Sequence, residues 1–334
     1  MDDQNEPVQP ERSLEAAAPP PAAPPPFTLG SIFWGPQGLR AGWRLLMYIA
    51  LVVVLFTGVS AVGRLIFPHP AKGFRARAAL GSEVVLLLVT MIPALIMGAI
   101  EKRSLRNYGL SGRGIFGRQF WLGCIWGILA ISALMLALRG VHGFYFGTLA
   151  LHGMRIAKWA VFWAGFFLFV GLFEEFFFRG YTLFTLSTGV GFWPAALILS
   201  VLFGGVHLQN PGEQWVGALA AGLIGLFFCL TLRRTGALWF AIGMHAAFDW
   251  GETFLYSVPD SGLITPGHLL NSFFHGPRWL TGGSVGPEGS VLIFVVIGLL
   301  FLIFNWMYPR ARFPVEREVS SAITGPSFSS PDST

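Results

Sequence analysis

Charge is the scarcest property of this 334-residue chain, because only 12% of its residues are Asp, Glu, Lys or Arg. A soluble domain carries about 25% charged residues. Hydrophobic residues make up 54% of the chain, and the mean hydropathy is +0.62. These values exclude an ordinary soluble globular protein and predict a protein whose surface faces lipid.

Three further features are missing from the sequence. The two cysteines, Cys124 and Cys229, each lie inside an apolar run, which argues against a structural disulfide. Basic residues form no stripe interleaved with exposed aromatics, so the net charge of +5 does not indicate a nucleic-acid partner. The N-terminal residues lack the basic segment and apolar core of a signal peptide, so we expect the first spanning helix to direct insertion.

Long apolar runs dominate the rest of the chain. A helix needs roughly 20 apolar residues to cross the hydrocarbon core of a bilayer. About eight such runs lie near residues 43–67, 80–100, 119–138, 157–178, 192–207, 215–232, 236–256 and 290–308. They lack the alternating pattern of a membrane barrel strand, and a spanning helix satisfies its own backbone. The sequence therefore predicts an all-α, polytopic membrane bundle of about eight helices, with its active site inside the bundle.

The two ends of the chain differ from its middle in composition. Residues 1–29 contain the run PPPAAPPP and are predicted to form a disordered arm, and residues 311–334 are predicted to form a flexible tail. Residues 30–310 then form the membrane domain. The loop at 102–118 alone holds five basic residues. This bias predicts that both termini lie in the cytoplasm of a cell whose plasma membrane holds the protein.

Ionisable residues inside the apolar runs are concentrated in the second half of the membrane domain. They are Glu174, Glu175, Arg179, His207, His245, Asp249 and Glu252, whereas the first three runs hold a single carboxylate, Glu83, near an end. Ionisable residues in a membrane face the bundle interior and indicate a functional site. We interpret Glu252 as an interfacial residue, because its helix is expected to end there.

The spacing of these residues predicts which of them meet. Glu175 and Arg179 are four residues apart and share a helix face, so they can form an ion pair. Glu174 points about a quarter turn away and is left free. His245 and Asp249 are also four apart, and His207, with Phe203 one turn before it, comes from another helix. Glu174, His207, His245 and Asp249 are therefore expected to form one cluster from three helices.

This cluster suits the hydrolysis of a peptide bond. A carboxylate in a medium of low dielectric constant is a stronger base, and a neighbouring histidine can share the proton of a water molecule. Two further polar groups can stabilise the oxyanion of a tetrahedral intermediate. The same Glu and His residues could instead hold zinc with an open position for water. The sequence leaves the metal undecided.

Each part of the cluster also has a simpler explanation. Two Glu residues and an Arg near a helix end are commonly an interfacial ion pair with extended side chains. A single buried histidine such as His207 is more often a hydrogen-bonded bundle residue. The specific signal is the occurrence of all three patterns in this order on successive apolar segments.

These patterns resemble the motifs of the CAAX-protease and bacteriocin-processing family of intramembrane proteases, also called the Abi family. The family motif EExxxR is matched by Glu174, Glu175 and Arg179, FxxxH by Phe203 and His207, and HxxxN or HxxxD by His245 and Asp249. The resemblance covers about residues 157–255. It implies that Glu174 and His207 activate water, and that His245 and Asp249 stabilise the oxyanion. The prenyl-processing branch carries Asn where this chain has Asp249.

The sequence thus predicts an intramembrane endopeptidase that cleaves a membrane-associated protein or peptide, in CAAX-type processing, peptide maturation or bacteriocin immunity. One alternative is a proton- or ion-coupled transporter in which the same Glu and His residues relay protons. The absence of an internal repeat between the two halves argues against it. A second alternative is a non-catalytic immunity or scaffold protein that retains the motifs.

Overall fold

The computed structural model describes residues 28, 30–35, 38–66 and 73–313. The expected arm at 1–29 and tail at 311–334 lie almost wholly outside these ranges. Every apolar run that the sequence predicts as a helix is helical. The fold is an all-α helix bundle, which confirms the predicted class. The two short strand pairs in the described ranges, β1 (Trp34–Gly35) with β2 (Gly38–Leu39) and β3 (Phe144–Tyr145) with β4 (Phe273–Phe274), lie in the connections.

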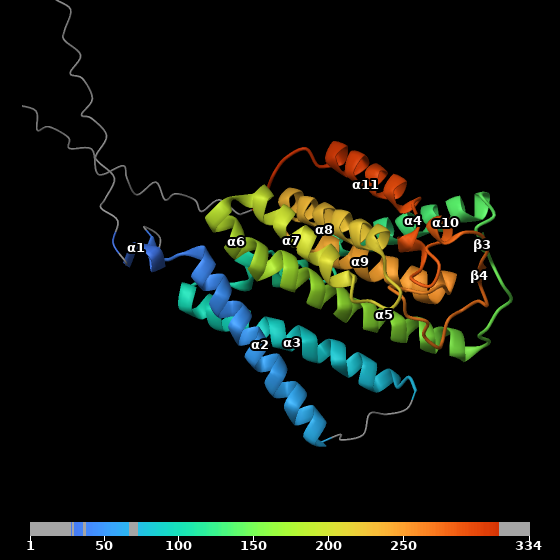
Figure 1. Cartoon of the computed structure of the whole chain (residues 1–334), viewed down its shortest axis with the longest axis horizontal. Helices are drawn as coiled ribbons and strands as arrows, with labels where there is room; N and C mark the ends of the chain where they lie inside the picture. Colours follow the sequence, from blue (N-terminus) through green and yellow to red (C-terminus); the bar gives the residue numbers. More distant parts are fainter. Residues whose placement is uncertain (1–27, 29, 36–37, 67–72, 314–334) are drawn as a thin grey trace, which may run out of the picture.

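The longer helices run roughly lengthwise along the bundle, with α2 and α3 at one side of it (Figure 1). The longer ones are α2 (Ala41–Ile66), α3 (Ala76–Glu101), α4 (Arg118–Gly140), α5 (Met154–Glu175), α6 (Leu183–Val190), α7 (Phe192–His207), α8 (Trp215–Thr235), α9 (Trp239–Trp250) and α11 (Ile293–Met307). Two π-helical segments continue longer helices: η3 (Phe176–Thr182) joins α5 to α6, and η4 (Gly251–Tyr256) extends α9. The remaining short helices are α1 (Gly30–Phe33), η1 (Leu105–Tyr108), η2 (Gly112–Gly114), α10 (Arg278–Thr281) and η5 (Pro287–Gly289).

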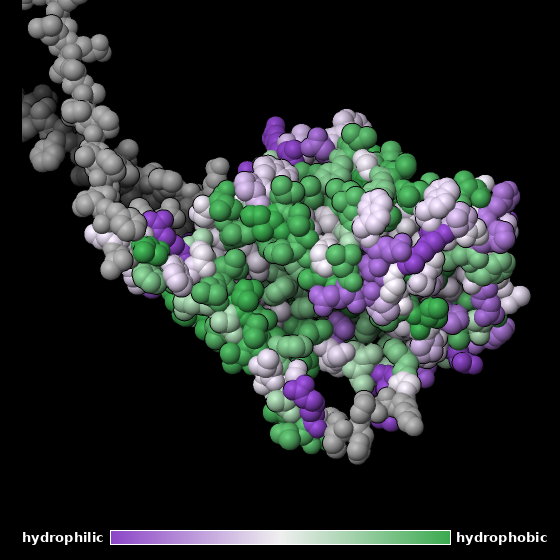
Figure 2. Space-filling view, in the orientation of Figure 1, coloured by the Kyte–Doolittle hydropathy of each residue, from purple (hydrophilic) through white to green (hydrophobic). Residues whose placement is uncertain are grey.

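Five helical stretches in the described part of the chain are long and apolar enough to cross a membrane. They are α2, α3, α4, the continuous stretch Met154–Val190 and α8, while α7 and α11 are apolar but shorter. Helix α2 fully buries only Tyr48, and large apolar side chains such as Val54 and Leu65 on it are exposed. Figure 2 shows hydrophobic side chains over the middle of the bundle and hydrophilic ones gathered near α10 and the β3–β4 pair. The protein is therefore an integral membrane protein.

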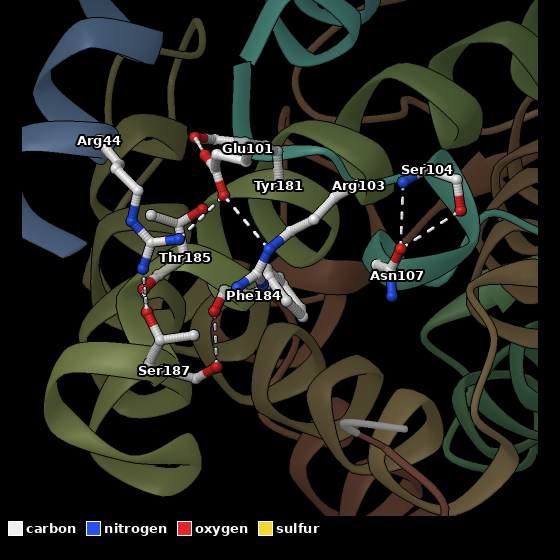
Figure 3. Close-up of polar contacts among 10 residues, drawn as sticks. Arg44, Glu101, Arg103, Ser104, Asn107, Tyr181, Phe184, Thr185 and Ser187 are labelled. Atoms are coloured by element: carbon white, nitrogen blue, oxygen red, sulfur yellow. Dashed lines mark hydrogen bonds and ion pairs between the residues drawn. The ribbon is translucent and has the colours of Figure 1, made fainter. Parts of the chain in front are cut away.

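A polar network joins several helices at the end of the bundle where α2 begins (Figure 3). The carboxylate of Glu101 accepts hydrogen bonds from Arg44 (2.9 Å) and from the hydroxyl of Tyr181 (2.5 Å), and Arg103 lies 3.6 Å away. Residues from α2, α3 and η3 thereby meet at one point. The backbone N–H of Arg312, beyond α11, donates to the carbonyl of Arg233 at this same end. The start of α2 and the end of α11 thus lie on one side of the bundle.

Helices α4 and α9 pack almost backbone to backbone through small residues. A Cβ atom added at Gly123 would lie 2.1 Å from the carbonyl oxygen of Phe240, and one at Gly127 would lie 2.3 Å from that of Met244. From α9, a Cβ at Gly243 would lie 2.2 Å from the carbonyl oxygen of Phe120. Small residues four apart are the usual basis of close helix approach in membranes. This contact fixes the position of α9, which carries His245 and Asp249.

Replacing Gly127 by Leu should therefore push α9 away from α4 and destabilise the bundle. Overpacking of a tight contact costs about 1–3 kcal/mol, so we expect a lower melting temperature for the purified protein in detergent. Gly58→Leu is the matched control, because no atom lies within 4 Å of a Cβ at Gly58 on α2. Equal melting temperatures for the two variants would contradict this account of the packing.

Candidate active site

Two adjacent carboxylates at the end of α5 point into different surroundings. Glu175 is completely buried, while 24% of the Glu174 side chain remains exposed. The chain continues from Glu175 into the π-helical segment η3, in which Gly180 leaves helical geometry with φ −82° and ψ −110°. Wider π-helical turns inside α-helices are frequent at functional sites.

The predicted ion pair between Glu175 and Arg179 is present. Arg179 Nη1 lies 3.1 Å from Glu175 Oε1, and the two side chains are 1% and 0% exposed. The guanidinium carbon also lies 4.0 Å from the centre of the Phe203 ring, within range of a cation–π contact. A Cβ at Gly225 would lie 2.4 Å from Arg179 Nη2, so α8 needs glycine there to admit this side chain.

His245 on α9 is held by carboxylates on both sides of its ring. Its Nδ1 lies 3.0 Å from Glu175 Oε1, so the imidazole N–H can donate to a carboxylate that Arg179 already neutralises. Its Nε2 lies 3.4 Å from Asp249 Oδ2 and 3.7 Å from Glu174 Oε2. Phe228 stacks on the ring at 5.7 Å between centroids. The expected proximity of His245 and Asp249 is confirmed.

His207 reaches the site from α7 and is oriented by its own helix. Its Nδ1 lies 2.7 Å from the carbonyl oxygen of Phe203, so Nδ1–H donates there and Nε2 is the ring nitrogen that can face the cavity. The predicted packing of Phe203 beside His207 is present, with ring centroids 4.6 Å apart. Among the described residues, no hydrogen bond or ion pair joins His207 to Glu174, His245 or Asp249.

One cavity of about 640 Å³ brings these groups together. Glu174, His207, His245 and Asp249 all line it, so the predicted cluster from three helices does face a common space. Most of the remaining lining is apolar and comes from α3, α5, α7, α8, α9 and α11. Glu83 on α3 also lines the cavity. The sequence did not assign it to the site, because it is a single carboxylate near the end of an apolar run.

The sequence left a zinc ion undecided, and the Glu and His residues considered as its ligands form no close group of three donor atoms in the described ranges. Over the described ranges, the group of three potential ligands whose donor atoms lie within 4.8 Å of one another is Glu252, Asp260 and Glu288. Glu174, His207, His245 and Asp249 supply no such group, and His245 already contacts carboxylates through both ring nitrogens. These four residues as placed do not fit a three-ligand zinc site.

The interpretation of Glu252 as an interfacial residue is wrong. The helix does not end at this position but continues as η4 to Tyr256, and the Glu252 side chain is completely buried. The sequence analysis did not identify Asp260 and Glu288, whose carboxylate oxygens lie close to that of Glu252. Asp260 and Glu288 each follow a proline, in the two connections between η4 and α11. Only the folding of these connections brings the two side chains together. Burial, together with the carboxylates of Asp249 and Glu288, raises the pKa of Asp260 well above its ordinary value.

Breaking the buried pair should cost more stability than changing its neighbour. Glu175→Gln or Arg179→Ala leaves an unpaired group in a medium of low dielectric constant, which typically costs about 3–5 kcal/mol. We expect a clear drop in the melting temperature in detergent for both variants. Glu174→Gln is the matched control, since it changes the adjacent carboxylate outside the pair. The pairing account fails if all three variants melt with the wild type.

The comparisons with known proteins point to one family. Residues 156–251 match the Rce1-like family model, described as a type II CAAX prenyl endopeptidase. This segment contains all six predicted site residues and runs from the start of α5 to the first residue of η4. Searches of curated proteins and of solved structures found no match. The predicted resemblance to the CAAX-protease and bacteriocin-processing family is confirmed over residues 156–251, which form an Rce1-like segment of this membrane protein.

Proposed function

We propose that this protein is an intramembrane endopeptidase that hydrolyses a peptide bond of a membrane-associated protein or peptide. The single observation that carries the proposal is the convergence of Glu174, His207, His245 and Asp249 on one cavity within an apolar bundle. The match of the same segment to type II CAAX prenyl endopeptidases supports a protease.

Glu174 acts as the general base in this proposal. Its neighbour Glu175 is occupied by Arg179 and His245, whereas Glu174 faces the cavity and contacts only His245 Nε2, at 3.7 Å, among the ion pairs of the described residues. The carboxylate takes a proton from a water molecule that His207 Nε2 helps to orient as an acceptor. The resulting hydroxide attacks the carbonyl carbon of the scissile bond. Glu174 then returns the proton to the departing amine, so that the free carboxylate is regenerated.

His245 and Asp249 stabilise the oxyanion that forms on the carbonyl oxygen. They lie 3.4 Å apart on one face of α9, so one substrate oxygen can contact both. Donation from Asp249 requires the protonated carboxyl, and donation from His245 requires a proton on Nε2. Hydrogen bonds to developing charge are strongest where water is excluded.

Glu175 and Arg179 act through His245 and do not touch the substrate. The ion pair keeps Glu175 an acceptor, and Glu175 in turn holds the His245 ring at 3.0 Å. This arrangement resembles the carboxylate that orients the histidine in other hydrolases. Arg179 and Glu175 are therefore positioning residues.

The substrate class follows from the lining of the cavity and from the matched family. A largely apolar cavity within a membrane bundle suits a substrate that carries a hydrophobic segment or a lipid near the scissile bond. A prenylated C-terminal peptide has this chemistry. We place the protein in the plasma membrane with both termini in the cytoplasm, in keeping with the basic residues of the connecting loops.

Glu174→Ala should abolish cleavage and leave the bundle folded. A positioned base contributes about 10²- to 10⁴-fold to the rate, and the Glu174 side chain belongs to no buried ion pair with Arg179. Turnover of a prenylated C-terminal peptide by protein in liposomes measures the effect, with the melting temperature as a check on folding. Glu213→Ala, in a loop outside the cavity, is the control and should cleave normally. Full turnover by Glu174→Ala would overturn the assignment of the base.

Asp249→Asn should retain activity at neutral pH. An amide donates a hydrogen bond to the oxyanion without needing a proton from solvent, so activity should also extend to higher pH than in the wild type. The pH dependence of kcat/KM measures both effects. A loss of more than about tenfold in a variant that still melts normally would show that the carboxylate itself is required.

A further inference from the structure

Three carboxylates meet outside the proposed catalytic cluster, at the far end of α9. Glu252 comes from η4, Asp260 from the connection that follows it, and Glu288 from η5 just before α11. One oxygen from each lies within 4.8 Å of the others. The ion pairs of the described residues include none to these three groups. Three acidic groups are therefore gathered without a basic partner in this part of the chain.

Glu252 is the member that requires an explanation. Its side chain is 0% exposed, and neither of its carboxylate oxygens has a hydrogen-bond partner in the structure. A buried carboxylate without a partner is strongly destabilising. One of its oxygens lies within 4.8 Å of an oxygen of Asp260 and of one of Glu288, two groups that repel it if they are charged. A ligand that binds all three carboxylates would remove this cost.

The other two carboxylates are oriented so that each keeps one oxygen free. Thr253 Oγ1 donates to Asp260 Oδ2 at 3.0 Å. The backbone N–H and the hydroxyl of Ser261 both donate to Glu288 Oε1, at 2.6 and 2.9 Å. No hydrogen bond to Asp260 Oδ1 or Glu288 Oε2 occurs among the residues that the structure describes. Such outer hydrogen bonds are typical of groups that orient metal ligands.

Glycine lets the backbone close around the same point. Gly286 has a φ of +122°, and a Cβ there would lie 2.8 Å from Glu252 Oε1 and 2.1 Å from the carbonyl oxygen of Pro259. The N–H of Gly262 donates to the carbonyl of Val285 at 2.8 Å and ties the two connections together. The carboxylates thus lie in an enclosure formed by η4 and two linked loops.

We propose that Glu252, Asp260 and Glu288 bind a divalent cation of the calcium type. The donor set consists only of oxygen atoms, which hard cations prefer, and it lacks the nitrogen or sulfur ligands typical of zinc. Ca²⁺ accepts irregular geometry and bidentate carboxylates, whereas Mg²⁺ demands near-octahedral geometry. A central ion offsets the repulsion among the three acidic groups.

The ion would brace the end of the helix that carries His245 and Asp249. Glu252 lies one turn beyond Asp249, and Asp260 and Glu288 line the same cavity as the catalytic cluster. Binding would fix both loops against η4 at the wall of that cavity. The inference concerns a structural ion, and it stands whether or not the protein proves to be a protease.

The test is Ca²⁺ binding by the full-length protein, purified in detergent and stripped with EGTA. Isothermal titration with CaCl₂ and, separately, MgCl₂ gives stoichiometry and affinity, and melting curves give stabilisation. We expect one Ca²⁺ per chain with a Kd of about 1 mM or tighter, weaker binding of Mg²⁺, and a higher melting temperature with Ca²⁺. Glu252→Gln, Asp260→Asn and Glu288→Gln should each weaken Ca²⁺ binding at least about tenfold, while Glu213→Gln, in another loop, should bind as the wild type does.

Four results would overturn the proposal. One is a wild type that neither binds Ca²⁺ nor gains thermal stability up to about 10 mM, ten times the weakest expected Kd. Another is unchanged affinity in the Asp260 and Glu288 variants, which lie in loops and remain informative if Glu252→Gln fails to fold. The third is Mg²⁺ binding as tight as that of Ca²⁺. A Glu252→Gln variant that is more stable than the wild type and does not respond to Ca²⁺ would instead identify a cluster of protonated acids.

Discussion

The buried pair of Glu175 and Arg179 is the interaction on which the site depends. Desolvation costs several kcal/mol for each ion in a protein interior, so a charged pair this deep needs strong local compensation. The compensation comes from the 3.1 Å contact, from the Phe203 ring under the guanidinium, and from the His245 N–H that reaches the same carboxylate. Residues of η3, α7 and α9 are thus tied to a single carboxylate.

The tight packing of α4 on α9 complements this polar centre. Glycines on both helices let the backbones approach, and α9 is thereby held from one side by α4 and from the other by Glu175. His245 and Asp249 have little freedom as a result. The helix held on both sides therefore carries the groups that we assign to the oxyanion, and this agrees with the need for preorganised donors.

The sequence predicted the features that depend on helical periodicity and on run length. All eight apolar runs are helical, and the four-residue spacings of Glu175 with Arg179 and of His245 with Asp249 correspond to real contacts. The features that depend on local irregularity were not predictable. The π-helical segment η4 carries the helix past Trp250 and buries Glu252, which a regular helix end would have left at the interface. Asp260 and Glu288 meet through loop closure, for which no spacing rule exists.

In the proposed reaction a water molecule connects Glu174 to His207, and the oxygen of that water enters the product. The most direct measurement is cleavage of a library of prenylated and unprenylated membrane peptides by the purified protein in liposomes. The reaction is run in H₂¹⁸O, with and without chelator, and the products are read by mass spectrometry. The account predicts cleavage at a defined peptide bond, with one ¹⁸O in the new carboxyl group and no need for added zinc. A wild-type protein that releases no product from any peptide under these conditions would contradict it.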